Sequence, residues 1–265
     1  MRRRYKKQYR AKRKNSIFRS KYFWFCFLAL IFLGTGVDVL FFSSFFQIGN
    51  IKIEGNEKVS IEEIKNIISR NTDKKFGVVE TKSIFLAELD KINNEILKEI
   101  PQIAKIKLIR NFPNTISAQV VERIPSAVFC EFKRCFLMDN GGVAYEDIDK
   151  IPANMPRITN ANFNKEIKLG EKPITDEQMN YVLKIASQIK VFNLSAIEFL
   201  VKSNTRLNVR MSDGWQVYLN PQKDIDKQIK NLGIILKEKL PIEKRKNLAY
   251  IDLRFDRIYI YPEGL

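Results

Sequence analysis

The chain has 265 residues and carries 46 lysines and arginines against 30 aspartates and glutamates, a formal net charge of +16, with no histidine. The lack of histidine excludes His-based catalytic triads, HExxH zinc sites and imidazole general bases. Residues 1–21 hold 11 of the basic residues and no acidic one. The remainder has 35 basic against 30 acidic residues, a balance that does not favour a nucleic-acid-binding protein.

Residues 22–42, YFWFCFLALIFLGTGVDVLFF, form an apolar stretch whose one charge is Asp38. A helix of this length crosses a hydrocarbon core about 30 Å thick. The basic residues before it predict a cytoplasmic tail held near anionic membrane lipids, with the rest of the chain exported. The run is long and FFSSFFQ follows without a small-x-small site, which disfavours a cleaved signal peptide. We therefore expect a single-pass type II anchor. Asp38 either reaches the outer headgroups or meets a polar group on a neighbouring span.

The first exported segment predicts the order β-α-α-β-β. Its apolar side chains alternate at a period of two in the strands and recur at helical spacing in the helices. Ser60 and Glu63 form a capping box, and Pro101 closes the second helix. The predicted elements are a strand at 48–54, a helix from 60, a polar loop at 71–82, a helix at 84–97, and strands at 105–108 and 116–122.

The rest of the chain predicts a β-rich domain with two helices, which makes the fold class α+β. Thr175 is the expected N-cap of the first helix, and Asp139–Gly142 is the clearest turn. The expected strands lie at 127–130, 135–138, 142–145, 157–158, 196–201, 206–211, 216–219, 249–255 and 257–261, and the helices at 175–189 and 224–240.

Three cysteines are present. Cys26 lies inside the apolar stretch, where it is a small apolar residue, and Cys130 and Cys135 are exported. In an oxidising compartment the exported pair predicts a disulfide across a tight hairpin, with modest stabilisation because the loop is short. A zinc half-site is the alternative, but no second Cys or His pair completes it.

Four stretches resemble one family. FQIGNIKIEGNEKVSIEEI resembles the opening of a POTRA (polypeptide-transport-associated) domain, and IPQIAKIKLIRNFPNTISAQVVERIPSAVF resembles its exit in the bacterial division protein FtsQ, also called DivIB. FLMDNGGVAYED and YIDLRFDRIYIYPEG are similar to later strands of that family. The resemblance implies a basic tail at 1–21, a transmembrane helix at 22–42, a POTRA domain at 46–123 and a β domain at 124–265.

The resemblance also implies the function. Members are non-enzymatic divisome components of the cytoplasmic membrane at the division septum. They hold the coiled-coil proteins FtsB and FtsL outside the cytoplasm and help control septal peptidoglycan synthesis by FtsW–FtsI. No cofactor or metal is implied.

The resemblance places partner binding on the last strands, where FtsB adds to the sheet edge. The expected partner-binding residues are Tyr250, Leu253, Arg254, Phe255, Ile258 and Tyr259. Phe255 stands where a tyrosine is familiar in the family. From the residues alone, a β-strand at this position is either an unpaired edge that accepts a partner strand or a central strand that is fully paired. On the edge reading, charge reversal at Arg254 or a polar substitution at Phe255 weakens partner capture without unfolding the domain.

Two other classes compete. A POTRA-containing protein of outer-membrane assembly or secretion is the first, disfavoured because no β-barrel-length sequence follows the module. An anchored cell-wall enzyme is the second: Ser187 and Lys190 have the S-x-x-K spacing of penicillin-binding enzymes. Such a site also needs SDN-like and KTG-like partners, which the sequence lacks.

Overall fold

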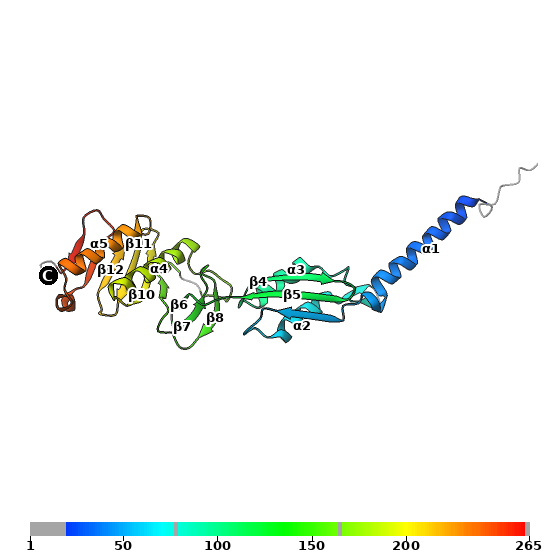
Figure 1. Ribbon diagram of the computed structural model, residues 1–265, viewed down its shortest axis with the longest axis horizontal. Helices are drawn as coiled ribbons and strands as arrows, with labels where there is room; N and C mark the ends of the chain where they lie inside the picture. Colours follow the sequence, from blue (N-terminus) through cyan, green and yellow to red (C-terminus); the bar gives the residue numbers. More distant parts are fainter. Residues whose placement is uncertain (1–19, 77–78, 164–165, 263–265) are drawn as a thin grey trace, which may run out of the picture. The chain divides into compact units, whose positions relative to one another are not determined.

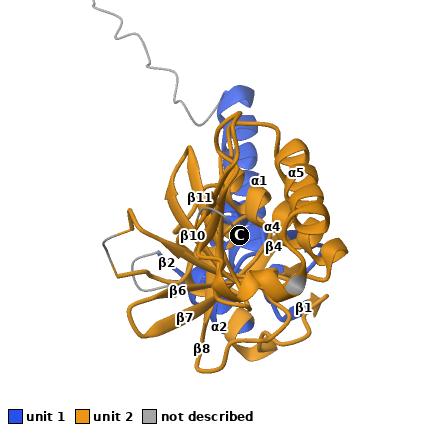
Figure 2. Ribbon diagram, turned by 90° about the vertical axis from the view of Figure 1, so that its left-hand side faces the viewer, with its two compact units in different colours: residues 1–52, 65–92, 108–118 blue, residues 53–64, 93–107, 119–265 orange. Residues whose placement is uncertain are grey.

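The computed structural model describes residues 20–76, 79–163 and 166–262, so the predicted cytoplasmic tail lies outside the described residues except for Ser20 and Lys21. The chain forms two compact units (Figure 2). One takes in the chain up to residue 52 with residues 65–92 and 108–118, and the other takes in residues 53–64, 93–107 and those from 119 onward. The element order confirms the predicted α+β class.

The apolar stretch forms helix α1, Lys21–Phe42, which has no buried residue. Among the described residues it is the helix long and apolar enough to cross a membrane. An amphipathic helix of a water-soluble domain buries one face, whereas α1 exposes apolar side chains all round. A short 3-10 helix, η2 (Ser44–Phe46), follows it directly.

The next elements confirm the predicted order β-α-α-β-β and add one hairpin (Figure 1). Their bounds are β1 Asn50–Glu54, α2 Ile61–Thr72, β2 Lys74–Phe76, β3 Val79–Thr81, α3 Leu89–Glu99, β4 Ile103–Asn111 and β5 Thr115–Glu122. The three-stranded sheet has the order β1-β5-β4. The fully buried side chains here are almost all isoleucine, among them Ile64, Ile68, Ile84, Ile92, Ile96, Ile103 and Ile116.

Two predictions for this segment were wrong. Residues 71–82 are not a loop, because β2 and β3 pair as an antiparallel hairpin, with Lys75 and Glu80 in an ion pair of 2.7 Å. Each of its strands, Lys74–Phe76 and Val79–Thr81, has only three residues, which is too short for an alternating pattern of apolar and polar side chains to reveal it. The second helix begins at Leu89 rather than at Ile84, because the backbone N–H of Ile84 donates to Phe46 O at 3.0 Å and is drawn into a β-type pairing instead.

The remaining strands form one nine-stranded sheet of order β14-β13-β12-β11-β10-β9-β6-β7-β8, and Figure 2 shows α4 and α5 beside it. The bounds are β6 Ala127–Glu131, β7 Arg134–Met138, β8 Ala144–Ile148, β9 Arg157–Asn160, α4 Asp176–Ile189, η3 Lys190–Phe192, β10 Ala196–Ser203, β11 Arg206–Met211, β12 Gln216–Leu219, α5 Ile225–Glu238, η4 Ile242–Asn247, β13 Tyr250–Asp252 and β14 Tyr259–Tyr261. Thr175 caps α4 in a full capping box with Gln178, which confirms the predicted N-cap.

One hydrophobic core joins this sheet to both helices. Trp215, Phe129, Phe136 and Phe199 are its largest buried side chains, and Leu232 of α5 and Val182 of α4 pack in the same cluster. Burial of such large apolar side chains contributes about 1.5–3 kcal/mol each.

Several strand boundaries differ from the prediction, and the structure gives the reason for two of them. The strand expected at 142–145 is β8, which starts at Ala144, because Asp139 Oδ1 accepts from the N–H groups of Gly141 and Val143 at 2.9 Å and holds those residues in a turn. The strand expected at 249–255 ends at Asp252, where the Asp252 carboxylate accepts from the backbone N–H of Arg254 at 3.1 Å and turns the chain.

Candidate functional site

The last two strands occupy different places in the sheet. β13 is central: Val217 of β12 is its parallel neighbour at Ile251, and Ile260 of β14 faces Ile251 from the other side. β14 is the final strand in the sheet order, and no described strand pairs with its outer side. The central reading therefore holds for β13 and the edge reading for β14. Such an edge leaves backbone N–H and C=O groups open to another strand.

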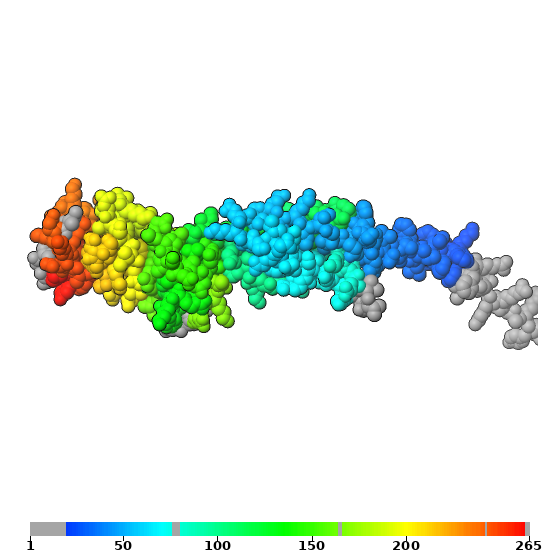
Figure 3. All heavy atoms as spheres, turned by 90° about the horizontal axis from the view of Figure 1, so that it is seen from below, coloured from blue at the N-terminus to red at the C-terminus, as the bar shows by residue number. Residues whose placement is uncertain are grey.

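The predicted partner-binding residues are brought near this edge but differ in exposure. Phe255 and Tyr259 are 54% and 48% exposed, and their rings meet edge-to-face at 6.3 Å. Tyr250 and Ile258 are half-buried, and Leu253 is buried in the core, where a partner cannot reach it without rearrangement. Figure 3 shows the last part of the chain, orange to red, at the surface.

Arg254 is bound by Asp252, the last residue of β13. Its Nε and Nη2 donate to the two carboxylate oxygens of Asp252 at 2.9 and 2.6 Å, and Asp252 is buried. This hydrogen-bonded pairing raises the pKa of Arg254 above its ordinary value. Reversing the charge at Arg254 would leave the buried Asp252 carboxylate without its partner and beside a like charge, at a cost in folding. Phe255 and Tyr259 are therefore cleaner positions for testing partner capture than Arg254.

Three tyrosines stack across the last strands on the sheet face opposite the core. Tyr218 of β12 and Tyr250 of β13 stack at 4.8 Å between ring centroids, and Tyr250 and Tyr261 of β14 stack at 5.4 Å. The Arg206 guanidinium lies 4.8 Å from the Tyr218 ring. Aromatic pairs of this kind contribute about 0.5–1.5 kcal/mol beyond their buried area. This tyrosine ladder ties the edge strand to the two strands behind it.

Sequence reasoning missed the tyrosine ladder. Each tyrosine stands next to an apolar residue of its strand, Val217, Ile251 or Ile260, that belongs to the core or packs against it. Because side chains alternate between the two faces of a strand, this pattern predicts that the tyrosines face outward. The stacking itself depends on the parallel register of β12 on β13, which places Gln216 opposite Tyr250 and Tyr218 opposite Asp252. Segments 30 residues apart carry no local signal of that register.

Cys130 and Cys135 lie directly opposite each other on β6 and β7, and the structure joins them by a disulfide with a Cα–Cα distance of 4.2 Å. Glu131 and Arg134 form the next pair in the register, and Phe132 adopts a positive φ of 51° in the turn. The six-residue hairpin predicted from the cysteine spacing is therefore the geometry observed.

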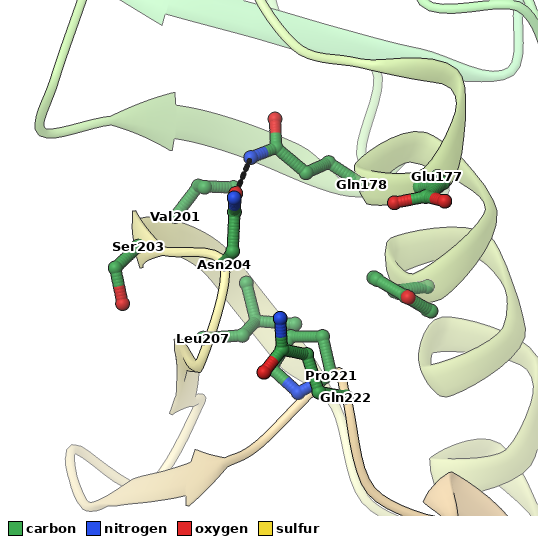
Figure 4. A pocket seen from close by; sticks show the side chains of 9 residues that line it. Glu177, Gln178, Val201, Ser203, Asn204, Leu207, Pro221 and Gln222 are labelled. Atoms are coloured by element: carbon green, nitrogen blue, oxygen red, sulfur yellow. Dashed lines mark hydrogen bonds between the residues drawn. The ribbon is translucent and has the colours of Figure 1, made fainter.

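A small hollow beside α4 holds about 60 Å³ (Figure 4). Gln178 Nε2 donates to Asn204 Oδ1 at 3.4 Å across its wall. Substrate and cofactor sites enclose about 300–1,000 Å³, so this hollow is too small for either. Within the described ranges, no group of three or more Asp, Glu or Cys side chains is placed to hold a metal ion.

Two family models match the chain. The POTRA domain, FtsQ-type, matches residues 46–123, and the family described as cell division protein FtsQ/DivIB, C-terminal, matches residues 131–254. The chain belongs to the FtsQ/DivIB family of cell division proteins. The resemblance found in the sequence is thereby confirmed. Helix α1, the one membrane-length apolar helix among the described residues, lies ahead of these domains and fits a membrane-anchored division protein.

Curated relatives named FtsQ or DivIB match the chain at low sequence identity. A cell division protein DivIB of Clostridium acetobutylicum is 26% identical over 82% of this chain and 83% of its own length. A cell division protein FtsQ of Streptomyces venezuelae is 23% identical over 49% of this chain and 45% of its own length, so the alignment spans about half of that relative. A solved extracytoplasmic domain of DivIB from Geobacillus stearothermophilus is 18% identical, covering 43% of this chain and 92% of that one, with a TM-score of 0.31.

Proposed function

We propose that this FtsQ/DivIB-family chain is a non-enzymatic scaffold of the division machinery. In this proposal α1 is a type II anchor in the cytoplasmic membrane, with residues 1–21 inside and a POTRA domain at 46–123 and a β domain at 124–265 outside. The scaffold works at the division septum, where it holds FtsB/FtsL-like coiled-coil proteins and helps control peptidoglycan synthesis by FtsW–FtsI.

The position of β14 carries the proposal. It is the end strand of the nine-stranded sheet, and its neighbour β13 is paired on both sides. A partner segment in extended conformation can add its backbone to β14, with side-chain specificity from the exposed Phe255 and Tyr259. The tyrosine ladder holds β14 in place before the partner arrives, so less ordering entropy is lost on binding.

Site-specific photocrosslinking in dividing cells tests the edge. A photoreactive amino acid replaces Tyr259 on β14 of the full-length chain, and in a matched strain it replaces Glu146 on β8, the strand at the opposite end of the sheet. We expect FtsB-like adducts from the Tyr259 position and none from Glu146. Adducts from Glu146 alone would place the partner on the other edge, and recovery of a barrel-assembly protein would contradict the division role.

Imaging of a tagged copy tests the localisation separately. Enrichment at mid-cell during septation is the expected result. A uniform peripheral signal in dividing cells would contradict a septal scaffold even if the crosslinks were found.

A further inference from the structure

Four phenylalanines form one continuous aromatic cluster just after α1. Ring centroids are 5.0 Å apart between Phe45 and Phe46, 5.2 Å between Phe46 and Phe85, and 5.3 Å between Phe85 and Phe112. Phe45, Phe85 and Phe112 are 61%, 39% and 59% exposed. We call these four residues the phenylalanine patch. Exposed apolar groups gathered in this way mark a contact surface more often than scattered ones do.

The C-terminal end of α1 is fastened to the same unit. Ser83 Oγ donates to Leu40 O at 2.9 Å, and Gln47 Nε2 donates to Phe41 O at 3.0 Å. Thr81 Oγ also donates to Phe41 O, and both hydroxyl residues are buried. The carbonyls in the last turn of a helix have no partner within the helix, so these three side chains satisfy groups that would otherwise need water. They fix where the helix ends.

Hydrogen bonds of the residues around Thr81 and Ser83 also hold the phenylalanine patch in place. The backbone N–H of Ile48 donates to Lys82 O at 2.9 Å, and that of Ile84 donates to Phe46 O at 3.0 Å. Arg110 Nε donates to Ile84 O at 3.0 Å, which joins the turn carrying Phe85 to the strand leading to Phe112. The exposed rings and the helix end therefore belong to one hydrogen-bonded assembly rather than to separate loops.

We propose that the phenylalanine patch inserts into the outer boundary between the lipid headgroups and acyl chains, so that it is a second membrane contact beside α1. This inference rests on the proposed function, in which α1 spans the bilayer. The 22 residues of α1 rise about 33 Å, enough to bring Phe42 to the far side of the hydrocarbon core. Phe45 follows three residues later, and aromatic and apolar side chains at that depth partition into the interface.

The lipid surface is the occupant favoured by continuity. Phe42 at the end of α1 is exposed, and the phenylalanine patch extends the apolar surface of the helix through η2 onto the turns that carry Phe85 and Phe112. Only two residues of chain separate Phe42, at the end of α1, from Phe45, so the phenylalanine patch begins close to the bilayer surface. A lipid contact would also restrict how the residues that carry the phenylalanine patch tilt against the bilayer.

Spin-label accessibility in lipid vesicles tests the proposal. The full-length chain is reconstituted into vesicles of phosphatidylglycerol and phosphatidylethanolamine, without other proteins. Single labels are placed on native Cys26, and in a Cys26→Ala background on Phe45→Cys, Phe112→Cys or Asn66→Cys, the last on the exposed side of α2. Collision rates with dissolved oxygen report lipid, and those with a water-soluble nickel chelate report water.

We expect the oxygen-to-nickel ratio at positions 45 and 112 to exceed that at 66 by about tenfold, as for groups at the headgroup boundary. Labels at 45 and 112 with the ratio of position 66, while the Cys26 label is in lipid, would overturn the inference and leave the phenylalanine patch to a protein partner. A water-exposed Cys26 label would overturn the anchor itself, and with it the proposed function. The labelled sites are exposed on the surface, so the label leaves the core intact, and circular dichroism of each variant checks this.

Discussion

Arg123 donates from Nη1 to Asp139 Oδ2, and the two side chains are only 17% and 10% exposed. Arg123 also donates from Nε to Pro101 O at 2.9 Å, while Asp139 Oδ1 holds the turn at Gly141 and Val143. Arg123, in the segment after β5, is thus joined by a hydrogen bond to the chain just after α3 and by an ion pair to the turn after β7. All of these residues belong to the second compact unit.

Replacing Arg123 with alanine is expected to lower the free energy of unfolding by about 3 kcal/mol, because it leaves the Asp139 carboxylate buried without a counter-charge. Denaturation of the full-length chain in detergent, followed by the fluorescence of the buried Trp215, measures the loss. Arg134→Ala is the matched control: Arg134 is 51% exposed and pairs with Asp147 at 2.6 Å, so its loss should cost less than about 1 kcal/mol. Equal losses would mean that burial does not decide the strength of the pair.

Gly55 cannot be replaced at low cost. Its φ is +87°, and a Cβ there would lie 2.3 Å from Val120 O. We expect Gly55→Ala to destabilise the fold by more than about 3 kcal/mol, from left-handed strain and a clash with backbone together. Gly214 has a φ of +94° with nothing within 4 Å of its would-be Cβ, so Gly214→Ala should cost only the conformational strain, about 1–2 kcal/mol. Thermal unfolding of both variants separates the two contributions, and the same cost at both sites would rule out the clash.

Tyr145 is expected to make the fold sensitive to alkaline pH. Burial raises the pKa of Tyr145 from its ordinary value of 10 to about 12, and the charges of Glu146 and Asp139 add to the shift. Above pH 10 the unfolded chain gains by releasing the phenol proton while the folded chain retains it, so stability falls as pH rises from 10 toward 12. Between pH 9 and 11 the wild type should lose on the order of 1 kcal/mol more than Tyr145→Phe. Parallel losses would show that Tyr145 releases its proton equally easily in both states.

The Cys130–Cys135 disulfide should add a measurable but modest stabilisation. Closing a six-residue loop removes few conformations from the unfolded chain, worth about 2 kcal/mol in the chain-entropy description. A thiol reductant is expected to lower the unfolding free energy of the wild type by this amount and to leave a Cys130→Ser/Cys135→Ser variant unchanged. Cys26→Ser in α1 serves as a control with no expected effect. An unchanged wild type under reductant would mean that the bond does not stabilise the fold.

Local patterns were sufficient for much of the fold. The apolar run with its basic flank, the N-cap at Thr175 and the helical stripe of α5 each depend on residues a few positions apart, and each was found. Residues 122–125, with the sequence ERIP, end the stretch that resembles the exit of the POTRA domain in the family, and the structure supplies their chemistry. Glu122 accepts from the backbone N–H groups of Glu57, Lys58 and Val59, at 2.7, 3.0 and 2.9 Å, ahead of α2, and Arg123 holds Asp139.

Glu122 shows how burial and hydrogen bonding compete. Burial raises the pKa of its carboxyl group, but the N–H groups of Val59, Glu57 and Lys58 outweigh burial and bring the pKa below its ordinary value. That balance depends on partners more than 60 residues away in the chain, so nothing in the ERIP letters predicts it.

The sequence alone determined the long apolar helix, most of the order of elements and the family, because periodicity, capping and charge depend on neighbouring residues. The tertiary structure decided which terminal strand is the edge, that Leu253 lies in the core, that Arg254 is taken up by Asp252, and that three tyrosines stack across β12, β13 and β14. Each of these depends on the register between strands that are distant in the chain. Register is set by the packing of the whole core, which no local stretch of sequence contains.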